Sequence, residues 1–178
     1  MKDDQSRQLV SACKQGDRNA FDALVGLYQK PVFNAVYRML NNVEEARDVT
    51  QTVFLKVYEN LHGYDESYKF FSWIYRIAIN EAINQQAGRK VHEPLNESME
   101  SREDPQRDAD RQEMQQEVQV ALMKVSADHR SVIVLKHFLG FSYQEISEIL
   151  KLPEKTVKSR LYEARDRLRE MLIKDSFL

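Results

Sequence analysis

Cations and hydroxyl groups gather near the end of the chain. Between Lys155 and Arg169 there are six basic and two acidic side chains, a local net charge of +4. Flexible cations and hydroxyls contact phosphates, and hydrogen-bonding side chains near the start of a helix can read base edges. The side chains that supply this chemistry are Lys155, Thr156, Lys158, Ser159, Arg160, Tyr162 and Arg165. The segment therefore predicts a DNA contact, although a basic helix of a structural bundle would have the same composition.

Two consecutive helices are predicted to position these side chains. The first begins with a capping box, in which Ser142 and Glu145 satisfy each other's backbone amides. It ends near Leu150, and Pro153 then suits the first turn of a longer helix. The inner face of that helix carries Val157, Leu161, Ala164, Leu168 and Leu172. This pattern is that of a helix-turn-helix, whose second helix enters the major groove of DNA.

The rest of the sequence also indicates helices. It has only five glycines and four prolines, and it lacks the alternation typical of strands. We expect a helix capped by Asp17, a separate helix opened by Pro31, and a break at Asn41-Asn42. Further helices are predicted at about 44–60, 70–86, 112–125 and 128–139, with a loop at 62–65 and stops at Gly88 and Gly140.

Charge is distributed unevenly along the 178 residues. The net charge of −2 combines +1 over residues 1–90, −6 over 91–117 and +3 over 118–178. The acidic segment carries Pro94 and Pro105 and few bulky apolar residues, which is typical of a flexible linker. We therefore predict an all-α protein with two small helical domains, 1–90 and 112–178, joined by an acidic flexible linker at 91–111. The C-terminal domain contains the helix-turn-helix.

The composition argues against several other classes of protein. No run approaches the ~20 apolar residues of a membrane span, and no signal segment is evident, so we expect a cytoplasmic protein without membrane insertion. The single Cys13 excludes an internal disulfide. The four histidines lack metal-ligand spacing, and His137 is expected to be half-buried packing. We expect no catalytic residue, no metal, no cofactor and no enzymatic activity.

Four short segments resemble a known family. Residues 141–146 read FSYQEI and residues 156–161 read TVKSRL, which is similar to the final region of bacterial RNA polymerase sigma factors of the extracytoplasmic-function (ECF) class. In the first domain, DVTQTVF at 48–54 and FSWIYRIA at 71–78, followed by Asn80, resemble the other conserved region of that class. The resemblance covers nearly the whole chain, in the family's order and spacing.

The resemblance implies that the first domain, region 2, docks on the clamp helices of the largest polymerase subunit. Asp48, Gln51 and Phe54 match the polymerase-binding positions, and Leu55 shares one flank of the helix with Asp48 and Gln51. Phe54 could instead be an ordinary core residue.

Region 2 of the family also recognises and opens the minus-ten element of the promoter. The resemblance assigns this role to the loop from His62 to Phe70 and to the helix after it. A displaced base needs hydrogen bonds for its edge and an apolar wall for its face. Candidate residues are Phe71, Arg76, Asn80 and Asn84. Trp73 could be a stacking platform, but its spacing to Ile77 is also that of a core residue.

The last domain resembles region 4, which reads the minus-thirty-five element and contacts the polymerase flap. Lys158, Ser159 and Tyr162 match the family's contact positions, and Thr156, Arg160 and Arg165 are expected on phosphates. Glu163 stands where many relatives have a basic residue, so it could accept a hydrogen bond from cytosine or repel phosphate.

The function implied is that of a sigma factor, which binds core RNA polymerase and directs promoter-specific initiation. Its expected partners are core polymerase, promoter DNA and an anti-sigma factor. The alternative is a helix-turn-helix regulator that acts without polymerase, but that function leaves the motifs at 48–54 and 71–80 without a role.

Overall fold

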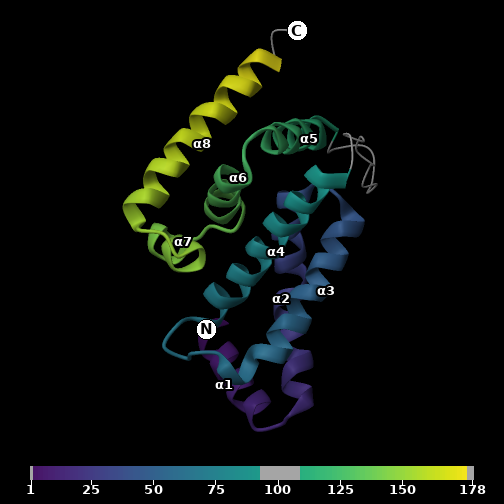
Figure 1. Cartoon of the computed structure of the whole chain (residues 1–178), viewed down its shortest axis with the longest axis vertical. Helices are drawn as coiled ribbons and strands as arrows, with labels where there is room; N and C mark the ends of the chain where they lie inside the picture. The colour runs from purple at the N-terminus through teal and green to yellow at the C-terminus, as the bar shows by residue number, and fades with distance from the viewer. Residues whose placement is uncertain (1, 93–108, 176–178) are drawn as a thin grey trace.

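The chain folds into two packed groups of helices (Figure 1). The computed structural model describes residues 2–92 and 109–175, and this part contains helices and no strand. The first group comprises α1 (Lys2–Lys14), α2 (Arg18–Leu40), α3 (Val43–Asn60), a short 3₁₀ turn (Leu61–Gly63) and α4 (Phe70–His92). The second comprises α5 (Ala109–Lys124), α6 (Ala127–Ile133), a π-helical turn (Val134–Phe138), α7 (Tyr143–Leu150) and α8 (Glu154–Asp175). The predicted all-α fold is confirmed.

Most of the predicted linker, residues 93–108, lies outside the described residues. Among the helices that the structure does describe, none is long and apolar enough to span a membrane.

Helix α2 is one continuous helix, so the prediction of a separate helix opened by Pro31 was wrong. Proline inside a helix costs roughly 3 kcal/mol. Leu24 and Tyr28 before the proline, and Val32 and Val36 after it, are all buried in the same core. Because burying each such side chain contributes about 1.5–3 kcal/mol, their packing outweighs the cost of the proline.

Helix α4 also continues past its predicted end at Gly88 and reaches His92. The positive-φ glycines of the described chain are Gly16 and Gly140, so Gly88 stays in the helical conformation. Arg89 holds this last part of α4 in place by donating to the carboxylate of Glu45 and to the backbone carbonyl of Leu40. A tertiary contact therefore overrides a local stop signal.

Other helix ends agree with the sequence. Asn41 takes a left-handed conformation (φ 52°) after α2, and the side chain of Asn42 caps α3 by accepting from the Glu45 amide at 3.0 Å. Gly140 has φ 73°. The predicted helix at 128–139 consists of α6 and the π-helical turn that follows it.

A buried arginine joins the two groups of helices. Arg130 on α6 is 1% exposed, and its partners are carbonyl oxygens rather than carboxylates. It donates to Leu122 (2.8 Å), Met123 (2.9 Å) and Val125 (2.9 Å) around the end of α5, and to Met39 at the end of α2. Burial lowers the pKa of Arg130 to about 10, which leaves it charged at neutral pH. The guanidinium thus satisfies carbonyls that each helix leaves unpaired at its C-terminus.

A second arginine reinforces this junction from the first domain. The Arg38 guanidinium on α2 donates to the side chain of Gln119 at 3.0 Å, and Gln119 donates back to the Arg38 carbonyl at 3.2 Å. The same guanidinium lies 4.5 Å from the ring centroid of Phe138. Both domains therefore contribute an arginine to one interface.

Replacing Arg130 by methionine is expected to lower the free energy of unfolding by about 3 kcal/mol, because methionine leaves several buried carbonyls without a donor. Urea denaturation followed by circular dichroism measures this change. Arg169→Met is the matched control, since Arg169 is exposed and its ion pair is with Asp166 of its own helix. Equal stability of the two variants would contradict the role assigned to Arg130.

Candidate functional site

The helix-turn-helix predicted from the sequence is present in α7 and α8. Both halves of the capping box form, with the Ser142 amide donating to Glu145 at 2.9 Å and the Glu145 amide donating to the Ser142 hydroxyl at 3.2 Å. After α7, Lys151 takes a left-handed conformation (φ 53°), and the Ser147 hydroxyl donates to the carbonyl of Leu152. This side-chain bond stabilises a tight turn in which the left-handed position is occupied by a lysine rather than a glycine.

Helix α8 presents most of the predicted DNA-contacting side chains to solvent. Val157, Leu161 and Ala164 are buried beneath it. The exposed members of the predicted set are Lys155, Lys158, Ser159, Tyr162 (74% exposed) and Arg165, whereas Thr156 and Arg160 are half-buried. One face of a single helix therefore carries cations, a hydroxyl and a phenol together.

Three ion-pair or hydrogen-bond contacts hold α8 against the preceding helices. Arg160 lies 3.6 Å from Asp128, Glu163 lies 3.4 Å from His129, and Arg165 donates to His137 at 3.0 Å. The contact with His129 gives Glu163 a structural partner, in addition to the two DNA roles considered from the sequence. His137 is exposed at the surface, although its ring is partly covered, and it accepts from Arg165, so it is a surface contact rather than the half-buried packing that we expected.

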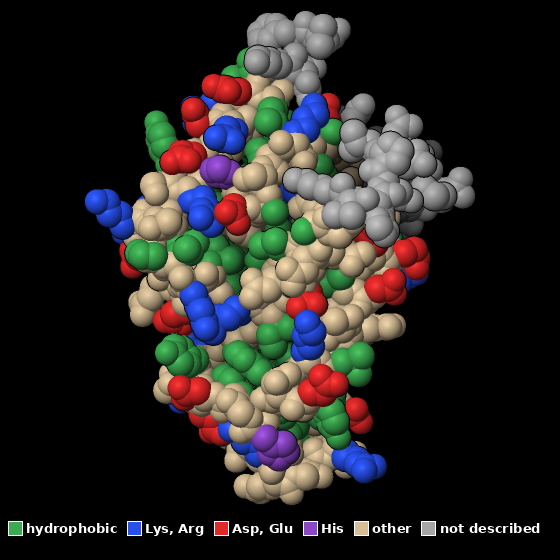
Figure 2. Space-filling model, viewed as in Figure 1, with side chains coloured by type: hydrophobic (Ala, Val, Ile, Leu, Met, Phe, Trp, Pro, Cys, Tyr) green, Lys and Arg blue, Asp and Glu red, His purple; other side chains and the backbone are tan. Residues whose placement is uncertain are grey.

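Figure 2 shows one face of the molecule, in the orientation of Figure 1. Basic and acidic side chains alternate there, with apolar side chains between them. The local excess of basic side chains at 155–169 lies within α8.

An apolar groove of about 390 Å³ lies between α2 and α3. Three of the predicted polymerase-binding residues, Gln51, Phe54 and Leu55, line it. Asp48 is exposed one turn earlier on α3 and is not among the lining residues. Phe54 is half-buried against the core and also lines the groove, a position that is compatible with both alternatives considered from the sequence.

The groove also contains residues that the sequence motifs did not single out. Tyr58 is 59% exposed beside Leu55, which is 63% exposed, and its ring meets Phe21 edge-on at 5.1 Å. Helical spacing from Gln51 could have identified Tyr58. Phe21 and Val25 come from α2, and only the packing of α2 on α3 brings them to this site.

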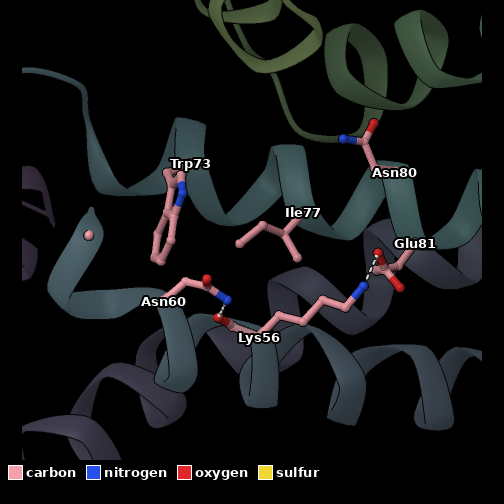
Figure 3. Close-up of a pocket in the computed structure, with 7 residues that line it drawn as sticks. Lys56, Asn60, Trp73, Ile77, Asn80 and Glu81 are labelled. Carbon is pink, nitrogen blue, oxygen red and sulfur yellow. Dashed lines mark hydrogen bonds and ion pairs between the residues drawn. The ribbon is translucent and has the colours of Figure 1, made fainter. Parts of the chain in front are cut away.

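A second depression, of about 380 Å³, lies between α3 and α4 (Figure 3). Its lining residues are Lys56, Asn60, Gly63, Trp73, Ile77, Asn80 and Glu81. Lys56 pairs with Glu81 at 2.6 Å, and Asn60 donates to the Lys56 carbonyl at 2.8 Å. In Figure 3 the Asn80 amide points away from this ion pair. Trp73 lines the depression and also packs on Tyr64, with ring centroids 4.9 Å apart, so its surroundings are compatible with both roles considered from the sequence.

The loop beside this depression is fixed by the first helix. Lys14 of α1 donates to the Tyr64 carbonyl at 3.0 Å and to the Glu66 carboxylate at 2.8 Å. Asp65 accepts from the Ser67 amide at 2.9 Å, which closes a local turn. The loop predicted to read DNA is therefore held from α1 as well as from its own ends.

The four predicted minus-ten residues do not form one cluster. Asn80 lines the depression, and Asn84 is exposed one turn later. Phe71 instead stacks on Phe141 of the second domain, with ring centroids 5.2 Å apart. Arg76 donates to two backbone carbonyls at the end of α7.

Comparison with known proteins shows which family this chain belongs to. Models of sigma-70 region 2 and sigma-70 region 4 match residues 24–90 and 115–168. The ECF RNA polymerase sigma factor SigW of Bacillus subtilis is 32% identical to this chain over 179 residues, which cover 93% of this chain and 96% of SigW. The chain belongs to the ECF RNA polymerase sigma factors. The RNA polymerase sigma-H factor of Pseudomonas aeruginosa is 31% identical, covering 95% of this chain and 94% of the relative.

Family membership confirms the function expected from the motifs. This sigma factor directs RNA polymerase to particular promoters, and it belongs to a class of DNA-binding regulatory proteins. A polymerase-independent regulator is not favoured, because both sigma regions are matched in order.

Solved structures support the same fold over nearly the whole chain. CnrH, solved in complex with the cytosolic domain of CnrY, matches with a TM-score of 0.75 at 26% identity, covering 96% of this chain and 99% of CnrH. The sigma factor RpoE of Bartonella quintana, solved with the anti-sigma factor NepR, shares the fold with a TM-score of 0.70 at 23% identity, covering 85% of this chain and 96% of RpoE. The match to CnrH spans both groups of helices of this chain.

Acidification is expected to weaken the contact between α8 and the π-helical turn. Partial burial, with the positive charges of Arg165 and Lys136, lowers the pKa of His137 below its ordinary value of 6.5. As the pH falls, His137 is therefore protonated first in the unfolded chain. The contribution of the neutral His137 imidazole to the stability of the folded protein is then lost as the pH falls below 6.5. Protonation also removes the acceptor that Arg165 uses.

Nuclear magnetic resonance titration of the imidazole measures this pKa directly. Arg165→Met is expected to raise the pKa of His137 toward 6.5, because one nearby cation is removed. Arg167→Met, which removes the same charge from an exposed position of the same helix, should leave the pKa unchanged. A pKa of His137 that does not respond to Arg165→Met would contradict the contact.

Proposed function

We propose that residues 1–90 of this sigma factor act as region 2, residues 91–111 as a tether, and residues 112–178 as region 4. This proposal is supported by two distinct surfaces, one on each domain. The region 2 match contains all the residues that line the apolar groove except Phe21, and the region 4 match contains the exposed basic face of α8. A protein-binding surface and a DNA-binding surface on separate domains are what a polymerase specificity subunit requires.

The groove between α2 and α3 is the proposed docking site for the clamp helices of the largest polymerase subunit. Exposed apolar side chains that adjoin one another mark protein interaction sites. Leu55 and Tyr58 provide such a pair, and Gln51 offers hydrogen bonds at the rim. Asp48, one turn away, would meet a basic group of the partner. Region 4 is proposed to contact the polymerase flap.

Helix α8 is the proposed reader of the minus-thirty-five element. Lys158, Ser159 and Tyr162 lie on its exposed face, where they could reach base edges in a major groove. Lys155, Thr156, Arg160 and Arg165 would hold phosphates on either side.

The depression between α3 and α4 is the proposed pocket for a base displaced from the minus-ten element. Trp73 and Ile77 supply an apolar wall, and the side-chain amides of Asn60 and Asn80 can bond the edge of a base. Asn84 extends this surface along α4, whereas Phe71 and Arg76 lie on the side of the same helix that meets the second domain. Binding and unstacking of the strand would then be concentrated on one helix.

A regulatory protein partner is also proposed. CnrH was solved with the cytosolic domain of CnrY, and RpoE with the anti-sigma factor NepR. By analogy we expect an anti-sigma factor for this chain, acting in the cytoplasm where core polymerase is found.

Transcription with purified core polymerase on a promoter library tests the overall function. Promoter-dependent initiation that requires this protein is the expected result. DNA binding without any association with polymerase would instead support the alternative of a polymerase-independent regulator.

Leu55→Arg is expected to weaken core binding at least tenfold, because a charge would be buried against the apolar partner surface. Titration of labelled protein with core polymerase measures the affinity. Ile173→Arg is the matched control, since Ile173 is 50% exposed near the end of α8, far from the groove in sequence. Unchanged binding by Leu55→Arg would argue against this docking site.

Asn80→Ala is expected to weaken binding of the minus-ten strand by roughly tenfold, the effect of losing one pair of base-edge hydrogen bonds. Strand binding by the assembled holoenzyme measures this loss, with core affinity as a second readout that should not change. Asn34→Ala, an exposed asparagine on α2, is the control. A comparable loss in both variants would rule out a specific role for Asn80.

A further inference from the structure

A lysine of the first helix holds the loop between α3 and α4. Lys14 is the last residue of α1, and its ammonium group donates to the Tyr64 carbonyl at 3.0 Å and to the Glu66 carboxylate at 2.8 Å. The same ammonium lies 5.6 Å from the centroid of the Tyr64 ring. We call residues 64–69 the reading loop, since they belong to the segment proposed to read the minus-ten element. One side chain of α1 thus contacts both the backbone and a charged group of this loop.

Helix α1 is a firm support for this lysine. Val10 of α1 is fully buried, and the hydroxyls of Ser6 and Tyr28 lie 2.8 Å apart where α1 packs on α2. Figure 1 shows α1 beside the chain that joins α3 to α4, and α1 packs on the 3₁₀ turn before the reading loop. The ammonium of Lys14 is therefore held from a packed helix rather than from a free chain end.

Tyr64 connects Lys14 to the depression between α3 and α4. The Tyr64 ring is buried, meets Phe70 edge-on at 5.6 Å and packs on Trp73 at 4.9 Å. Trp73 is in turn a lining residue of the depression (Figure 3). The Tyr64 hydroxyl also donates to the Tyr68 carbonyl, which ties the start of the reading loop to its end. Moving the Tyr64 backbone would therefore disturb both the loop and one wall of the depression.

The charge of the reading loop also depends on Lys14. The loop contains Asp65, Glu66 and Lys69, a net charge of −1, which Lys14 brings to zero. Hydrogen bonds from Ser67, together with the positive charge of Lys14, hold the pKa of Asp65 below its ordinary value, so Asp65 is ionised at neutral pH. A DNA strand carries a negative charge on every phosphate, and a Glu66 carboxylate without its cation would repel it.

The ion pair of Lys14 with Glu66 contributes little to stability by itself, because half of the Glu66 side chain is exposed to water. Its importance is in the shape and charge of the loop. We propose that Lys14 is a positioning residue for minus-ten recognition, which fixes the reading loop in its binding shape and cancels the charge of Glu66. Lys14 lies before the region 2 match at 24–90, so a helix outside that match would set how tightly the strand binds. This role rests on the function proposed above for the loop and the depression.

The first test is binding of a minus-ten single strand by the assembled holoenzyme. If the reading loop keeps its binding shape in ~20% of molecules without Lys14, the apparent affinity of Lys14→Met falls ~5-fold. Affinity for core polymerase should not change, because α1 does not line the groove between α2 and α3. Lys136→Met is the matched control: Lys136 is also half-buried, donates to the Phe141 carbonyl at 3.0 Å and lies 4.7 Å from the Tyr143 ring centroid. It lies in the second domain and should leave strand affinity unchanged.

The order of the loop is measured separately in the free full-length protein. Trp73 is the single tryptophan of the chain, so quenching of its fluorescence by acrylamide reports on the packing of Tyr64 against it. Lys14→Met is expected to increase this quenching, because Tyr64 loses the donor to its carbonyl. Lys136→Met should not change it.

Two further variants separate the shape of the loop from its charge. Lys14→Arg keeps the cation and its donors, so strand affinity should stay within about twofold of the original. Adding Glu66→Gln to Lys14→Met removes the uncompensated carboxylate and should restore strand affinity by ~2-fold, the effect of one unit charge about 10 Å away in water. The rest of the loss should remain, because the Tyr64 carbonyl still lacks its donor.

Weaker strand binding and stronger Trp73 quenching in Lys14→Met, with recovery in Lys14→Arg, support the positioning role. Weaker strand binding with unchanged quenching overturns it and assigns Lys14 to a direct phosphate contact. An equal loss of core affinity overturns it as well, since the effect would then be one of general stability.

Unchanged strand binding by Lys14→Met also overturns the role, and Asn80→Ala in the same assay shows how far the failure extends. If Asn80→Ala weakens strand binding, the proposed minus-ten function stands and only the role of Lys14 is lost. If neither variant weakens it, the minus-ten function of the depression fails together with the role of Lys14.

Discussion

The arrangement of the two domains depends on where the buried guanidinium of Arg130 finds its hydrogen-bond acceptors. A guanidinium that is 1% exposed must find acceptors inside the protein. It finds them at the C-terminal ends of α5 and α2, whose last carbonyls have no partner within their own helices. One side chain therefore satisfies two helix ends and fixes α6 against both. The positions of α7 and α8 follow from this, because they pack on α6 and on the π-helical turn after it.

Helix α4 is the element on which the functional surfaces converge. Its side facing α3 forms a depression with Trp73 and Asn80, and another side carries Phe71 and Arg76 toward α7. The same helix thus contacts a neighbour in its own domain and the first helix of the helix-turn-helix. This explains why residues that a single motif groups together divide into two environments in the folded chain.

Local sequence signals identified the elements wherever the chain satisfies its own hydrogen bonds. The capping box at Ser142 and the helix break at Asn41-Asn42 need only neighbouring residues, and both form as predicted. The signals at Pro31 and Gly88 failed because distant contacts opposed them. Burial of α2 on both sides of Pro31, and the bond of Arg89 to Glu45, extend those helices beyond their predicted ends.

The sequence by itself determined the helical class, the helix-turn-helix and the family, since these depend on periodicity, caps and the order of motifs. It also identified three residues of the apolar groove, because they share one helix. Only the tertiary structure decided that Phe21 and Val25 complete that groove, that Glu163 meets His129, and that Arg76 faces α7. The physical reason is that these contacts join residues on different helices, and their formation depends on packing geometry that no local spacing encodes.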